Sequence, residues 1–131
     1  MFDSLARYSP QALSILRIVA ALVLLQYGTA KLLGFPPVPI FAGVKLFSLY
    51  GVAGLFELFG SALLLIGLFT RPVAFILSGE MAAAYFMGHF PKGFIPLLNG
   101  GNEAVLFCFV FFYFIFAGPG PWSVDALRRS A

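Results

Sequence analysis

The chain has 131 residues, of which 61% are hydrophobic and 10% are charged, and its mean hydropathy is +0.99. A soluble domain typically has about 25% charged residues and exposes few large apolar patches, so this composition excludes a water-soluble globular protein and indicates a membrane protein. The formal net charge of +3 comes from eight scattered Lys and Arg residues that form no basic stripe, which argues against nucleic-acid binding.

Four apolar stretches approach the length of about 20 residues that a helix needs to cross the hydrocarbon core of a bilayer. The first follows Ser9-Pro10, and the third follows an FTRP turn in which Thr70 and Pro72 fit a helix start. The fourth has only 14 apolar residues, AVLFCFVFFYFIFA, before GPGP ends it. The predicted helices cover about 13–33, 46–69, 73–90 and 103–117. We therefore expect one all-α domain over 1–131, a transmembrane four-helix bundle with no sequence repeat.

Two connections between these helices are themselves apolar. FPPVPIFAGVK at 35–45 is rich in Pro and is expected at the membrane interface, and FIPLL at 94–98 fits a stretch that dips back into the membrane beside the short fourth helix. Arg17 and Gln26 bracket the apolar core of the first helix, which argues against a cleaved signal peptide. The single cysteine, Cys108, lies in an apolar run and is expected to be a small buried or lipid-facing side chain.

The distribution of basic residues predicts the orientation of the bundle. With four spans both termini share one side, which holds Arg7, Arg71, Arg128 and Arg129, with Arg17 just inside the first helix. The other side holds Lys31, Lys45 and Lys92. Basic residues favour the cytoplasmic side, so we expect a multi-pass chain with both termini in the cytoplasm.

Several charged residues fall inside the predicted helices, where a charge at the membrane centre costs about 2.5–3.5 kcal/mol on insertion scales and normally faces the bundle interior. Arg17 and Lys31 are 14 residues apart and lie on one face of the first helix. Glu57 has glycine, alanine and serine at three and four residues on either side, which lets a neighbouring helix approach closely. Glu80 is likewise flanked by a glycine and by alanines. We therefore expect these side chains to point into the bundle.

Depth along the helices predicts a polar cluster in the outer half of the bundle. The candidates for ligand binding or proton relay are Lys31, Glu57, Glu80, His89 and Glu103, with Tyr27 and Tyr85 as hydrogen-bond donors. A purely structural alternative pairs Lys31 with Glu57 to fix helix register and places Glu103 at the positive end of the fourth helix. A metal site at Glu80, His89 and Glu103 is disfavoured, because a nine-residue spacing puts the first two on opposite faces of a regular helix. We predict no metal site.

A second group lies at the predicted cytoplasmic end. We expect Arg71 to anchor the positive side and Asp125 to pair with Arg17 or Arg71. The segment GPGPWSVDALRR, with Gly118, Gly120 and Trp122, is the candidate for docking a partner protein. These residues are expected to be structural or partner-docking rather than catalytic.

Five segments in order resemble the DoxX family of small four-helix bacterial membrane proteins: GTAKLLG, ELFGSALLLIGLFTRP, EMAAAYFMGHFPKG, NGGNEAVLF and GPGPWSVD. The resemblance covers roughly residues 10–127. It implies a location in the bacterial inner membrane. It also implies a membrane partner of redox systems, since relatives in the wider group look like a thiosulfate:quinone oxidoreductase subunit and part of an oxidative-stress complex. The positions that it highlights are Lys31, Glu57, Gly67, Arg71, Glu103, Gly118, Gly120 and Asp125.

Three functions are compatible with these features. In the first, the polar cluster binds a small amphipathic molecule such as a quinone, and a soluble oxidoreductase supplies electrons, because the chain has no CxxC, haem-ligand pair or nucleotide motif of its own. The chain is then an accessory subunit of a quinone-linked oxidoreductase. In the second, it is a non-catalytic scaffold that recruits a soluble partner. In the third, it transports a small solute, which requires a homo-oligomer because four short helices are too few for alternating access.

Overall fold

The computed structural model describes residues 1–130, and every regular element within them is helical. A 3-10 helix over Phe2–Tyr8 precedes the first α-helix, and further short 3-10 helices occupy Pro39–Phe41 and Phe90–Lys92. The α-helices are α1 (Ser9–Leu33), α2 (Leu49–Ile66), α3 (Thr70–Ala84), α4 (Pro96–Asn99), α5 (Asn102–Ala117) and α6 (Val124–Ser130). The prediction of an all-α fold is confirmed.

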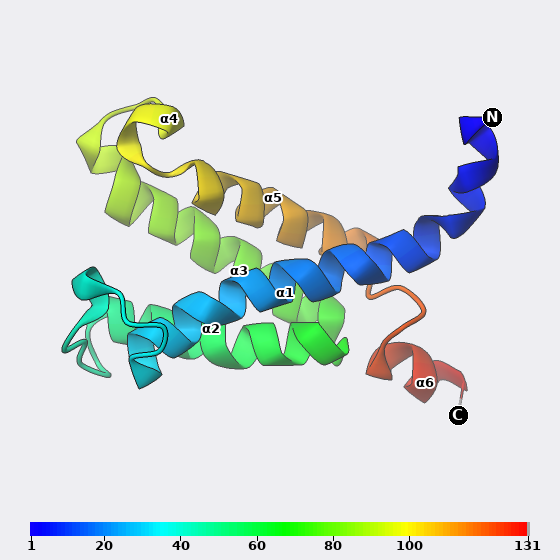
Figure 1. The fold of residues 1–131 in the computed structure, drawn as a ribbon, viewed down its shortest axis with the longest axis horizontal. Helices are drawn as coiled ribbons and strands as arrows, with labels where there is room; N and C mark the ends of the chain where they lie inside the picture. The colour runs from blue at the N-terminus through cyan, green and yellow to red at the C-terminus, as the bar shows by residue number, and fades with distance from the viewer. Residues whose placement is uncertain (131) are drawn as a thin grey trace.

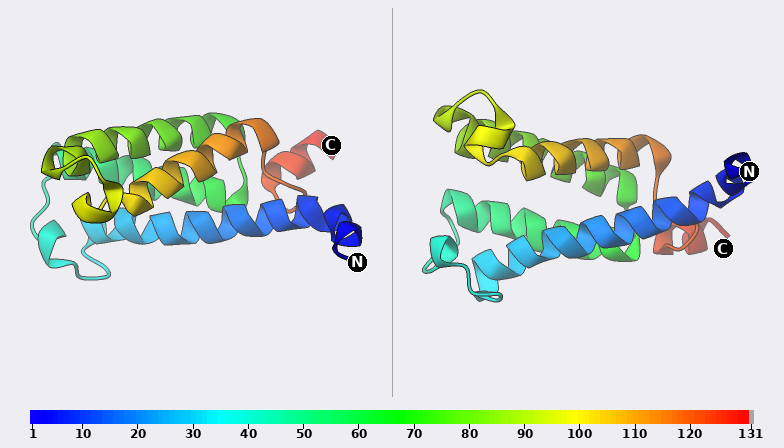
Figure 2. Two further views of the ribbon diagram at one scale, coloured as in Figure 1. Left: turned by 90° about the horizontal axis from the view of Figure 1, so that it is seen from above. Right: turned by 45° about the horizontal axis from the view of Figure 1, so that its top comes forward.

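The long helices are arranged as two packed pairs (Figures 1 and 2). Helix α1 lies along α2, α3 lies along α5, and the two pairs meet mainly where α2 contacts α3. Both ends of the described chain lie at one end of this bundle, with the α2–α3 turn, while α4 and the α1–α2 connection lie at the other (Figure 1). We call these the terminal end and the loop end. The shared position of the termini agrees with an even number of crossings.

Three helical stretches are long and apolar enough to cross a membrane: Phe2–Leu33, Leu49–Ile66 and Thr70–Lys92. Helix α5 is also apolar but shorter, about 24 Å at 1.5 Å per residue. Large apolar side chains face outward on all of them, as Phe75 and Phe109 do with 67% and 64% of their surface exposed. An outer surface of this kind needs lipid around it, so the chain is an integral membrane protein.

The core is formed where helix faces that carry small side chains meet the side chains of α5. Ala21 of α1, Leu64 of α2 and Ala74 of α3 are fully buried against Phe111 and Phe114 of α5. The phenylalanines of α5 thus divide between the core and the lipid-facing surface. In lipid the hydrophobic effect does not drive helices together, so close van der Waals packing at alanine and glycine stabilises their association.

The predicted boundaries of the middle helices were wrong by three to six residues, because residues distant in sequence or of special conformation set them. Helix α2 starts after Ser48, whose hydroxyl accepts a hydrogen bond from the Gly51 N–H at 3.1 Å, and it ends at Gly67, which has φ 72°. Helix α3 starts at Thr70 rather than at 73. Its α-helical part stops at Ala84 and continues as a π-helical turn over Tyr85–His89.

Candidate functional site

A buried ion pair joins α1 to α2 toward the loop end of the bundle. The Nζ atom of Lys31 lies 2.8 Å and 3.1 Å from the two carboxylate oxygens of Glu57. The side chains are only 9% and 2% exposed, and this is the one ion pair within residues 1–130. The Lys31–Glu57 pairing that the structural alternative predicted is therefore present. Little of either side chain is exposed, so each charge is stabilised mainly by the other.

Glycines on both helices allow this close approach. A Cβ atom at Gly28 of α1 would lie 2.5 Å from the backbone nitrogen of Leu58, the residue after Glu57. A Cβ atom at Gly54 of α2 would lie 3.0 Å from the Cβ atom of Lys31. The small residues that the sequence places around Glu57 thus bring the backbones together at the depth of the charges.

A second, half-buried carboxyl lies beside the Lys31–Glu57 ion pair. Glu80, on α3, lies beside the carboxyl of Glu57 and within the electrostatic reach of Lys31. Its Oε1 atom is buried, and no hydrogen-bond donor of residues 1–130 reaches it. Two carboxyl groups therefore face a single ammonium group, and two carboxyls that share a site do not both ionise readily. The arrangement is able to hold one exchangeable proton. We refer to Lys31, Glu57 and Glu80 as the charge cluster.

Three aromatic rings surround the ammonium group of Lys31. Its Nζ atom lies 5.9 Å from the ring centre of Tyr27, 5.2 Å from that of Phe41 and 5.8 Å from that of Tyr50. The negative faces of such rings stabilise a cation at these distances. Phe41 and Tyr50 were missed from the sequence. Phe41 reaches Lys31 because the Pro-rich connection folds back over the end of α1, whereas Tyr50 lies in the first turn of α2, whose start was predicted at another residue. An aromatic residue close to the prolines of the connection was the available signal for Phe41.

Tyr27 also links the charge cluster to α5. Its hydroxyl donates a hydrogen bond of 2.8 Å to Glu103, which is exposed in the first turn of α5. Polar groups therefore run from an exposed carboxyl, through a half-buried tyrosine, to the buried Lys31. Helices α1 and α5 otherwise contact each other sparingly.

His89 and Tyr85 lie in a different polar group, centred on the buried Asn99 of α4. The Nδ1 atom of His89 is 3.1 Å from the Asn99 carbonyl oxygen, and the Asn99 side-chain amide donates to the Tyr85 hydroxyl at 3.2 Å. The Tyr85 hydroxyl in turn donates to the carbonyl of Phe94 at 3.2 Å. This group holds the 93–101 connection against the end of α3. Across residues 1–130, no three His, Cys, Asp or Glu side chains gather closely enough to hold a metal ion.

The buried Arg17 stabilises the terminal end. It is 1% exposed, and its guanidinium donates to the carbonyl oxygens of Pro119, of Trp122 at 2.6 Å and of Leu65 at 3.4 Å. The Ser14 hydroxyl accepts a hydrogen bond from the Trp122 N–H at 3.1 Å. The segment after α5 is thus fastened to α1 by its backbone, which requires the left-handed conformation of Gly118 and Gly120, with φ 79° and 81°.

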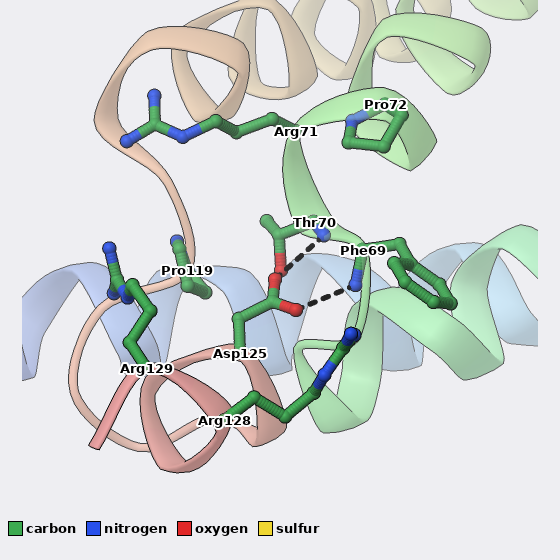
Figure 3. A pocket seen from close by; sticks show the side chains of 8 residues that line it. All are labelled: Phe69, Thr70, Arg71, Pro72, Pro119, Asp125, Arg128 and Arg129. Atoms are coloured by element: carbon green, nitrogen blue, oxygen red, sulfur yellow. Dashed lines mark hydrogen bonds between the residues drawn. The ribbon is translucent and has the colours of Figure 1, made fainter. Parts of the chain in front are cut away.

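The expected pairing of Asp125 with Arg17 or Arg71 is wrong. The two carboxylate oxygens of Asp125 accept hydrogen bonds from the backbone N–H groups of Phe69 and Thr70, at 2.8 and 2.9 Å (Figure 3). Asp125 therefore caps the start of α3 from 55 residues away, where free N–H groups favour an anion. Arg71 instead donates to the carbonyls of Ile115 and Phe116, at 3.0 and 2.6 Å, which satisfies the last turn of α5.

Comparison with known proteins identifies the family. The sequence profile of the DoxX family matches residues 12–90, which is more than half of the chain. The chain belongs to the DoxX family. It is also 45% identical over 128 residues to an uncharacterized protein of Haemophilus influenzae, with 94% of this chain and 95% of the relative covered. No solved structure matches it.

Positions highlighted by the resemblance to DoxX proteins fall into the two groups just described. Lys31 and Glu57 form the buried ion pair, and Glu103 is connected to it through Tyr27. The others close the terminal end of this DoxX chain, namely Gly67, Arg71, Gly118, Gly120 and Asp125. The family match at 12–90 includes the whole charge cluster but ends before Glu103 and Asp125.

The cap formed by Asp125 predicts a pH dependence of stability. Partial burial disfavours the charged carboxylate, but hydrogen bonds from Thr70 and Phe69 and the nearby Arg128 outweigh this effect, and the pKa of Asp125 is held below its usual value. The stabilisation is therefore present above the unfolded-state pKa of about 3.9 and is lost as the pH falls through the lowered folded-state value.

We expect Asp125→Asn to lower the melting temperature of the detergent-solubilised protein by a constant amount between about pH 5 and pH 8. The difference from the wild type should shrink below about pH 4, where the wild-type carboxylate also becomes protonated. Asp3→Asn, which alters an exposed acid of the N-terminal 3-10 helix, is the matched control. A difference that persists unchanged at low pH would show that the charge of Asp125 is not what stabilises α3.

Proposed function

We propose that this DoxX-family protein is the membrane subunit of a redox system and that its charge cluster binds the polar head of a small amphipathic molecule, a quinone. The observation that carries the proposal is the pair of carboxyls, Glu57 buried and Glu80 half-buried, that faces one ammonium group. A register-fixing ion pair needs only Lys31 and Glu57. The additional carboxyl of Glu80 has a buried oxygen that lacks a donor within residues 1–130. Burying this oxygen costs stability unless a ligand or a bound proton satisfies it.

The chemistry of the cluster suits a quinone head. The Lys31 ammonium is a donor for a carbonyl oxygen, and the carboxyl pair both donates and accepts, according to which member holds the shared proton. Aromatic rings at Tyr27, Phe41 and Tyr50 offer flat apolar contact beside these polar groups. Electrons for any change in the redox state of the quinone come, in this proposal, from a soluble oxidoreductase partner.

The two-pair architecture supports entry from the lipid. Helix α1 and helix α5 belong to different pairs, and Tyr27–Glu103 is a polar contact between them near the depth of the cluster. A ligand that enters between these helices would break only the Tyr27–Glu103 hydrogen bond among the hydrogen bonds within residues 1–130. The Glu103 side chain is already exposed, so the loss of this bond would not leave a buried carboxylate without a partner. In our proposal, both termini lie in the cytoplasm and the cluster lies in the outer half of the inner membrane, as the distribution of basic residues favours.

The experiment uses a photoreactive short-chain quinone analogue with the protein in lipid nanodiscs. We expect labelled residues to map to α1, α2 and α3 around Lys31. Glu80→Gln keeps the shape of the side chain and leaves the Lys31–Glu57 pair intact, but removes the exchangeable proton. It should therefore weaken labelling about tenfold, the effect of one lost hydrogen bond in a buried site.

Asp3→Asn is the matched acid-to-amide control, because Asp3 is exposed and distant in sequence from the cluster. Both variants should have the melting temperature of the wild type within a few degrees. Equal labelling of the wild type and the Glu80→Gln variant, or labels confined to the terminal end, would disprove quinone binding at the cluster.

A scaffold function remains the second candidate, because the Trp122 side chain is 53% exposed although its backbone is held by Arg17 and Ser14. A rigid backbone that presents an exposed tryptophan suits recognition of a partner. Trp122→Ala should then abolish co-purification of the partner without altering quinone labelling. Deleting the whole segment is a poorer test, since it would also remove the acceptors of Arg17. Transport by a homo-oligomer is the third and least supported candidate.

A further inference from the structure

A basic pocket opens at the terminal end, separate from the charge cluster. It has a volume of about 410 Å³ and is lined by Arg71 of α3, by Arg128 and Arg129 of α6, and by Phe69, Pro119 and Asp125 (Figure 3). In Figure 3, Arg71 and Arg129 extend on the side of Pro119, whereas Arg128 extends toward Phe69. Three guanidinium groups from two helices therefore surround one space.

The positive charge of this pocket is only partly balanced from within. Its single carboxylate, Asp125, is engaged by the backbone N–H groups of Phe69 and Thr70, and no arginine forms an ion pair within residues 1–130. Arg71 donates only to neutral carbonyl oxygens. Arg128 stacks on the Phe69 ring at 5.0 Å, which leaves its charge in place. The pocket therefore has a surplus of two positive charges.

Apolar surface continues from the pocket along the bundle. Arg71 donates to the carbonyl of Phe116, whose side chain is 65% exposed on α5, and Phe75 on the next turn of α3 is 67% exposed. A bound molecule therefore meets cations at one end and a lipid-facing surface of α3 and α5 at the other. A free anion would use only the first of these features.

We propose that the pocket binds the phosphate of an anionic phospholipid, with Arg71, Arg128 and Arg129 around the headgroup and the acyl chains along α3 and α5. Guanidinium groups bind phosphate through parallel, charge-assisted hydrogen bonds. Basic pockets next to membrane-spanning helices attract anionic headgroups in the same way. Inorganic phosphate shares this chemistry but lacks the chains, so the two sources are distinguishable.

The test is native mass spectrometry of the detergent-solubilised full chain, titrated separately with phosphatidylglycerol and with phosphatidylcholine. We expect the wild type to prefer phosphatidylglycerol. Each arginine near an anionic headgroup contributes about fivefold, so Arg128→Gln with Arg129→Gln should weaken phosphatidylglycerol binding about thirtyfold. Arg7→Gln, which removes an exposed arginine of the N-terminal 3-10 helix, should change it less than about twofold.

Arg129→Gln alone guards against a folding artefact, because Arg129 makes no hydrogen bond or ion pair within residues 1–130. It should still weaken binding about fivefold. An equal effect of Arg7→Gln would show a diffuse surface charge in place of a site. The absence of preference for phosphatidylglycerol, or its displacement by an equal concentration of inorganic phosphate, would overturn the assignment to a lipid.

Discussion

Lys31→Met is expected to lower the free energy of unfolding by about 3–5 kcal/mol, because it leaves Glu57 as an unpaired charge in a site where it is 2% exposed. The remaining carboxylate would lie beside Glu80 with no cation to balance either. The measurement is unfolding of the protein in mixed detergent micelles, followed by loss of helical signal as the denaturing detergent increases. A smaller effect would mean that the carboxyls simply take up protons when the lysine is absent.

The double variant Lys31→Met with Glu57→Met separates architecture from function. Replacing both members of a buried ion pair by apolar side chains of similar size is often neutral, so we expect most of the stability to return. Lys92→Met, at an exposed lysine of the same chain, controls for loss of a charge in general. If the stable double variant also labels normally with the quinone analogue, the pair serves only to hold α1 against α2.

Arg17→Met is expected to cost about 2–4 kcal/mol, because the carbonyl oxygens of Pro119 and Trp122 would lose a charged donor in a buried place. We also expect trypsin to cleave after Arg128 or Arg129 faster, since the fastening of the segment after α5 to α1 would then depend on Ser14. Arg17→Lys should recover little, because an ammonium group cannot donate to three carbonyls in the geometry of a guanidinium fork.

Arg7→Met is the control for tryptic sensitivity, as Arg7 is exposed and, within residues 1–130, its guanidinium contacts only the neighbouring Tyr8. Rapid cleavage in both variants would show that the segment is accessible regardless of Arg17. Unchanged cleavage in the Arg17→Met variant would contradict the role assigned to this side chain.

The sequence predicted the parts of this molecule that depend on local composition and helical period. Apolar length located the spanning helices, and the small residues around Glu57 correctly indicated a face turned toward another helix. The depth of Lys31 near the end of α1 placed it level with Glu57, so an ion pair between them was one of the alternatives. The face around Glu57 follows from the helical period, because a side chain three or four residues away lies on the same helical face.

Contacts between residues far apart in the sequence could not be predicted from local composition and helical period. The cap on α3 comes from Asp125, which reaches Phe69 and Thr70 because Arg17 and Ser14 hold the segment between α5 and α6 against α1. Phe41 covers Lys31 only because its connection folds back. His89 was placed with the acids by depth, but the π-helical turn before it and its hydrogen bond to Asn99 put it in another group.

The closure of the terminal end can be completed only late in synthesis. The buried guanidinium on α1 and the start of α3 both have partners in residues that leave the ribosome after all the long helices. Until then, Arg17 lacks its acceptors at Pro119 and Trp122, and the α2–α3 turn has open backbone donors. Membrane insertion of the four long helices therefore precedes the last step of folding, in which α6 closes the bundle.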